Sequence, residues 1–198
     1  MALSTARRLL LPVRQYYVQT DSGIPGQASR MCFSSTCAMA VKYLRPEALR
    51  GVNADDTYLH TVHRYGDTTS ATAQIKACAD YGITARFSSS GDRSFLEREL
   101  LQGYPLATGF LHHGPSSSPR GGGHWILAVG YQPGAGVFND PYGELNNIAG
   151  GYVRIGSGGH FVAYSWRHWL PRWEVEGPGS GWCLSFRRSD GLPPPVLP

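Results

Sequence analysis

The chain has 198 residues, of which 41% are apolar and 12% aromatic, and its 18 Lys and Arg against 14 Asp and Glu give a net charge of +4. This composition can bury a substantial core, which excludes an intrinsically disordered chain. Its 25 glycines and 14 prolines follow no repeating period, which argues against collagen, a coiled coil or a helical bundle and favours a mixed fold.

The basic residues are scattered and form no stripe interleaved with aromatics, so we predict no nucleic-acid partner. The apolar run at 9–13 is shorter than the core of a secretory signal and lacks a small-residue cleavage site. No other stretch approaches the roughly 20 apolar residues that span a bilayer. We therefore predict a soluble protein without a signal peptide, with an N-terminal arm (1–12), one domain (13–188) and a Pro-rich tail (189–198).

The first half of the domain carries helical signals. Residues 13–19 are predicted to form a short strand or an extended arm before a turn-rich loop. Ser34 to Thr36 offer N-cap chemistry ahead of a helix that ends before Pro46, so that Cys32 lies just before this helix or in its first turn. Further helices are expected at 54–65, 70–81 and 94–101.

The second half carries strand signals. Short β runs are expected at 105–111, 125–131, 137–139, 152–155 and 182–186, separated by glycine-rich turns. The aromatic residues from 161 to 173 recur at near-helical spacing and indicate core or lid packing. Helices first and strands afterwards, with no βαβ alternation, predict an α+β fold in which an N-terminal helical half packs on a C-terminal antiparallel sheet.

The four cysteines form no C-x-x-C pair, so they are predicted to be thiols and not disulfides or zinc ligands. The N-terminus of a helix stabilises a thiolate through its dipole and its free N–H groups, which makes Cys32 a candidate nucleophile. Cys37, Cys78 and Cys183 are predicted to be small buried hydrophobic residues.

Two residues of the second half could serve such a nucleophile. His124 lies where a mobile glycine run, 121–123, enters an apolar strand, and Asp140 ends the next strand along the chain. Each alone has a plainer interpretation, as a strand-capping histidine and a turn-forming aspartate. Together with Cys32 they supply a nucleophile, a general base and a group that orients the base.

The segments 16–19, 32–39, 123–131 and 139–143 resemble the motifs of papain-like cysteine peptidases of the bacteriocin-leader-processing type, within the C39-like group of bacterial and phage proteins. The resemblance covers roughly residues 13 to 145. It implies a papain-like fold, a peptide or protein substrate, and no cofactor or metal.

By this resemblance Cys32 is the nucleophile, His124 is the general base and acid, and Asp140 fixes the imidazole. The family also has a glutamine upstream of the nucleophile whose amide binds the oxyanion. Gln19 is the better match for this glutamine, and Gln27 is a competing candidate. The sequence departs from the family at Phe33-Ser34, where Gly and Pro usually follow the nucleophile, and this departure bears on the range of substrates.

The predicted function is a cysteine peptidase that hydrolyses a peptide bond through a thioester, in the cytoplasm or associated with a virion. An alternative is a peptidoglycan peptide hydrolase with the same triad, and another is a non-catalytic phage structural or binding protein on this fold. The pair His112-His113 is interpreted as a strand edge, and His60 and His63 as exposed residues, because no further metal ligands accompany them.

Overall fold

The structure is a computed structural model that describes residues 8–195. Its helices are α1 (Cys32–Leu44), α2 (Ala54–His63), α3 (Ala71–Asp80), α4 (Arg93–Leu101) and α5 (Trp166–Trp173), with a 3-10 turn at Gln19–Asp21. Its strands are β1 (Leu9–Leu10), β2 (Ile83–Gly91), β3 (Leu106–His113), β4 (Arg120–Gln132), β5 (Ala135–Asn139), β6 (Gly143–Leu145), β7 (Tyr152–Ile155), β8 (Val162–Ser165) and β9 (Gly181–Arg188). The predictions for positions 1–7 and 196–198 lie outside the described residues.

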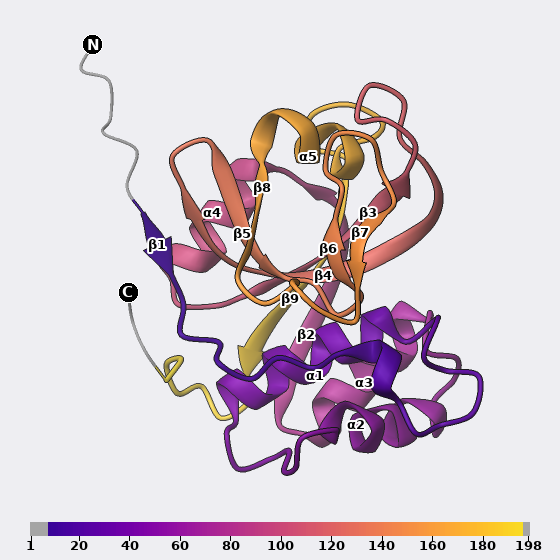
Figure 1. Cartoon of the computed structure of the whole chain (residues 1–198). Coiled ribbons are helices and arrows are strands. Elements are labelled where there is room, and N and C mark those ends of the chain that lie inside the picture. Colours follow the sequence, from indigo (N-terminus) through magenta and orange to yellow (C-terminus); the bar gives the residue numbers. More distant parts are fainter. Residues whose placement is uncertain (1–7, 196–198) are drawn as a thin grey trace.

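The helices and strands form two lobes (Figure 1). Helices α1, α2 and α3 lie together beside one end of an antiparallel sheet, and α1 packs directly on β4 and β3. The sheet has the strand order β2-β9-β3-β4-β5-β8, with β1 paired to the C-terminal end of β4. Strands β6 and β7 form a separate hairpin. The predicted α+β class, with helices on an antiparallel sheet, is confirmed.

Helix α1 is buried around almost its whole circumference, because all its residues apart from Lys42 are shielded from solvent. The predicted N-cap at Ser34 to Thr36 is wrong, since these residues lie inside the helix and Met31 is its N-cap residue. Their hydroxyls instead make buried bonds to other elements: Ser35 donates to the carboxylate of Asp55 at 2.7 Å, and Thr36 donates to the carbonyl of Trp125 at 3.0 Å. These bonds fix α1 between α2 and β4.

Local signals explain the other helix boundaries. Ser70 and Asp92 cap α3 and α4, and each side chain accepts a bond from the backbone N–H three residues later. The predicted helices of the first half are therefore confirmed to within a few residues. Helix α4, however, packs on β3 and β4 and belongs to the sheet side.

The strand predictions are correct where the strands are apolar and incomplete elsewhere. The segment 13–19 was predicted to be a short strand or an extended arm. The strand does not form, because residues 11–18 have no regular secondary structure. The glycine run 121–123 is part of β4 and is not a loop, and β2, β6 and β8 were not predicted. Strand β2 is mostly polar and half exposed, so only its ladder with β9, from the other end of the chain, makes it a strand.

Helix α5 carries the predicted aromatic stripe on its buried face. Trp166, Trp169 and Trp173 are all buried, which confirms the core interpretation. On the same helix the fully buried guanidinium of Arg172 donates to several backbone carbonyls, including those of Leu111 and Gly114 at the end of β3. Within residues 8–195 no helix combines the length and apolar character that crossing a bilayer requires.

Candidate active site

Cys32 lies at the entrance of a cleft of about 710 Å³ between the two lobes. It is the first residue of α1, as the sequence indicated, and its side chain is buried but lines the cleft. The N–H groups of the first helical turn have no acceptors inside the helix, and no side chain caps this turn. The helix therefore presents free donors and the positive end of its dipole beside the sulfur.

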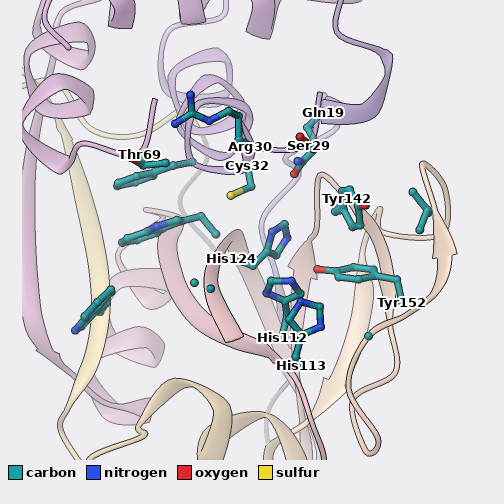
Figure 2. Close-up of a pocket in the computed structure, with 17 residues that line it drawn as sticks. Gln19, Ser29, Arg30, Cys32, Thr69, His112, His113, His124, Tyr142 and Tyr152 are labelled. Atoms are coloured by element: carbon teal, nitrogen blue, oxygen red, sulfur yellow. The ribbon is translucent and has the colours of Figure 1, made fainter. Parts of the chain in front are cut away.

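His124 faces Cys32 from β4. In the register of the sheet it lies opposite Phe110 of β3, so a hydrogen-bonded ladder fixes its backbone. Cys32 and His124 line the same cleft, as Figure 2 shows. The imidazole Nε2 lies 2.8 Å from Oδ1 of Asp140, so Nδ1 is the ring nitrogen left to interact with Cys32.

The charge state of His124 follows from its partners. Burial by itself would lower the pKa of this imidazole. The carboxylate of Asp140 and the side chain of Cys32 outweigh burial through charge and hydrogen bonds, and together they raise the pKa of His124 to about 10. The site therefore favours an imidazolium at neutral pH.

Asp140 is fully buried directly after β5, and its carboxylate is surrounded by donors. Besides His124, Oδ1 accepts a bond from the backbone N–H of Tyr142 at 3.0 Å. Oδ2 accepts from the hydroxyls of Tyr152 and Tyr164, each at 3.1 Å. A buried carboxylate without such donors would be costly, so these bonds offset the cost of burial and hold the orientation of the carboxylate.

The two tyrosine hydroxyls remain protonated donors. Burial, followed by the charge of Asp140, raises the pKa of both Tyr152 and Tyr164 well above the usual range. Sequence reasoning missed both residues, and a tyrosine in a short strand carries no local signal that would single it out. They contact Asp140 only because β7 and β8 fold back over the end of β5.

The structure distinguishes the two candidate glutamines. Gln19 lines the cleft together with Cys32 and is buried. Its Nε2 donates to the carbonyl of Ala28 at 3.0 Å, and its backbone N–H donates to the carbonyl of Pro141, directly after Asp140, at 2.9 Å. Gln27 is half-buried and is not among the residues that line the cleft. Of the two glutamines, Gln19 is the one that lines the cleft with Cys32.

The histidine pair at the end of β3 also lies at the cleft. The rings of His112 and His124 have centroids 5.5 Å apart. Burial, followed by the charges of His124 and His113, lowers the pKa of His112 to about 4, so its ring is neutral at neutral pH. Among residues 8–195 no cluster of three metal-ligating side chains is present.

The other three cysteines are buried and the two histidines of α2 are exposed, as the sequence predicted. Cys37, Cys78 and Cys183 are buried free thiols away from the cleft, and His60 and His63 are exposed on α2.

The α+β fold, with a thiol at a helix start that lines the same cleft as a histidine on a sheet, is typical of cysteine hydrolases. The family model described as the Peptidase C39-like family matches residues 13–166. The chain belongs to this family of C39-like peptidases.

Solved structures agree with this assignment at the level of the fold. A protein from Bacillus anthracis described as a C39-like peptidase is similar, with 11% identity and a TM-score of 0.57 over 91% of this chain and 98% of that chain. The peptidase domain of Streptococcus ComA, a bifunctional ABC transporter of a quorum-sensing pathway, is similar with 15% identity and a TM-score of 0.50 over 80% of this chain and 91% of that chain. The predicted C39-like fold is thus confirmed. No match to the sequence is found among curated proteins.

Proposed function

We propose that this chain is a cysteine peptidase that hydrolyses a peptide bond through Cys32, His124 and Asp140. The observation that carries the proposal is that Cys32 and His124 line one cleft, with the imidazole hydrogen-bonded to the buried carboxylate of Asp140, in a member of the C39-like peptidase family. A raised imidazole pKa favours a thiolate–imidazolium pair, which is the nucleophilic form of such a site.

The reaction begins when the thiolate of Cys32 attacks the carbonyl carbon of the substrate amide. Negative charge develops on the carbonyl oxygen, and the Cys32 N–H and the Gln19 amide are the donors placed to bind it. The tetrahedral intermediate collapses as His124 gives its proton to the amide nitrogen, and the amine leaves. Water, deprotonated by His124, then hydrolyses the thioester and releases the acid and the thiol.

Asp140 acts on the imidazole and not on the substrate. Its bond to Nε2 keeps Nδ1 directed at the sulfur and stabilises the imidazolium, while the surrounding hydroxyls hold the carboxylate in place.

The open floor of the cleft suits an extended peptide. Gly122 and Gly123 line the cleft, and a Cβ at either position would meet no atom within 4 Å. A polypeptide backbone can therefore approach β4 closely beside His124.

A comparison of the wild type with Cys32→Ala on a proteome-derived peptide library tests the proposal, with new N-termini identified by mass spectrometry. The wild type should generate cleavage products and Cys32→Ala should generate none. Cys183→Ala is the matched control, because this buried thiol lies outside the cleft and its removal should leave cleavage intact. Equal cleavage by the wild type and Cys32→Ala refutes the proposal.

The same proteins incubated with purified peptidoglycan distinguish the two peptide substrates. Release of soluble muropeptides that depends on Cys32, without cleavage of the peptide library, assigns the site to cell-wall peptides. Absence of both activities, in a folded wild type whose Cys32 reacts no faster than an ordinary thiol, supports a non-catalytic role.

A further inference from the structure

The residue that departs from the family motif lies in an aromatic stack at the reaction centre. Phe33 directly follows Cys32 on α1, and Trp125 directly follows His124 on β4. Their rings are parallel within 1° and their centroids are 3.7 Å apart. The stack therefore joins the two elements that carry the sulfur and the imidazole, at the position next to each.

Trp125 packs closely against both Gly109 and Phe33. In the sheet register it lies opposite Gly109 of β3, and a Cβ at Gly109 would lie 2.9 Å from the Cε2 and Cζ2 atoms of the indole. The indole thus rests on the backbone of β3 and is covered by Phe33. Both rings are almost completely buried, with 1% of Phe33 and 9% of Trp125 exposed.

A second contact supports the same junction. The hydroxyl of Thr36, one turn further along α1, donates to the backbone carbonyl of Trp125 at 3.0 Å. The side chain and the backbone of Trp125 are therefore both held by α1, while its strand is held by β3.

We propose that Phe33 and Trp125, seated on Gly109, are positioning residues that set the separation between the sulfur of Cys32 and the imidazole of His124. The inference rests on the proposed function in that it assigns these two groups as the reacting pair. Neither ring carries a group that reacts. A rigid stack between the two elements fixes the distance between them, and a misplacement of about 1 Å at a reacting group can cost about a hundredfold in rate.

A double-mutant cycle on Phe33 and Gly109 tests the proposal. Gly109→Ala adds a methyl group where the indole now lies, and Phe33 stacks on this indole, so the added methyl group should press the indole against Phe33. Phe33→Ala opens the space into which the indole can move. The milder Phe33→Leu keeps an apolar side chain if Phe33→Ala does not fold, and Phe186→Leu, a buried aromatic on β9 away from the cleft, is the matched control.

Two quantities are measured on each folded variant: the rate of Cys32 alkylation by iodoacetamide at about pH 6, and kcat and KM on a peptide that the wild type cleaves. Alkylation needs only the thiolate–imidazolium pair and no peptidase activity. If the wild type cleaves no peptide, the proposed function fails, yet the alkylation rates still decide whether the stack positions the pair.

We expect Gly109→Ala to lower both the alkylation rate and kcat by about tenfold or more, with KM changed by less than about twofold. In the Phe33→Ala background, or in Phe33→Leu if Phe33→Ala does not fold, the same change at Gly109 should cost less than about twofold, because the strain is transmitted only through the stack. Phe186→Leu should lower the melting temperature and leave both rates unchanged. The proposal is overturned if the effects at Gly109 and Phe33 simply multiply, or if both variants keep wild-type rates and lose only thermal stability.

Discussion

Replacing Asp140 with Asn removes the charge that sustains the candidate ion pair. The substitution keeps the size of the side chain and one of its two acceptor oxygens, but it replaces the other oxygen with an NH2 group and removes the negative charge 2.8 Å from Nε2 of His124. For charge centres about 4 Å apart at an effective dielectric constant of about 20, this charge contributes about 4 kcal/mol, or roughly 3 pKa units. We therefore expect the pKa of His124 to fall from about 10 to about 7 or below.

The assay is an NMR titration of the His124 imidazole together with the pH profile of Cys32 alkylation. In the wild type the imidazolium should persist through the neutral range, with rapid alkylation. In Asp140→Asn the imidazole should lose its proton near neutrality, and alkylation at about pH 7.5 should slow by about tenfold or more, because the thiolate loses its cationic partner. Asp190→Asn is the control, because it removes an exposed carboxylate that does not line the cleft. It should leave both profiles unchanged.

Folding stability gives an independent readout of the same charge. The pKa of His124 is higher in the folded protein than its ordinary value of 6.5, so the imidazolium stabilises the fold below about pH 6.5. This contribution is lost as the pH rises from 6.5 through about 10. Asp140→Asn should remove most of this pH dependence from the free energy of unfolding. An imidazole that titrates in Asp140→Asn within half a unit of the wild type would refute the reasoning.

Two further predictions concern single residues. Gln19→Ala should lower kcat by about a hundredfold through loss of an oxyanion donor and leave the rate of Cys32 alkylation unchanged. Gln27→Ala should retain full activity. If Gln27→Ala lowers kcat and Gln19→Ala does not, Gln27 is the oxyanion donor. Burial raises the pKa of Asp55 to about 6, with smaller contributions from Asp56 and Asp21, despite the hydrogen bond from Ser35. The wild type should therefore lose up to about 3 kcal/mol of unfolding free energy between about pH 4 and pH 7, whereas Asp55→Asn should not. Denaturant titrations at both pH values check this prediction. It is contradicted if the difference in unfolding free energy between the wild type and Asp55→Asn is the same at pH 4 and pH 7.

Several features of the site could be predicted from local sequence. A thiol at a helix start, a histidine that enters an apolar strand and an aspartate at a strand end each produce a pattern over a few neighbouring residues. Helix periodicity and capping residues located α2, α3 and α4 in the same way, because these signals act between residues that are adjacent in the chain.

Other features depend on segments that are distant in sequence. The tyrosine hydroxyls reach Asp140 from β7 and β8, and β2 becomes a strand only through its ladder with β9. Phe33 is a departure from a motif in the sequence and half of a stack in the structure. No local pattern encodes such contacts, since they exist only once the lobes have packed.

The sequence by itself determined the fold class, the positions of α1 to α4, and which cysteine, histidine and aspartate were candidates for chemistry. Only the tertiary structure decided which glutamine lines the cleft, which donors surround the carboxylate of Asp140 and which contacts join α1 to β4. The physical reason is one of range: periodicity and capping are properties of neighbouring residues, whereas the charge state and position of a buried group are set by whatever packs against it.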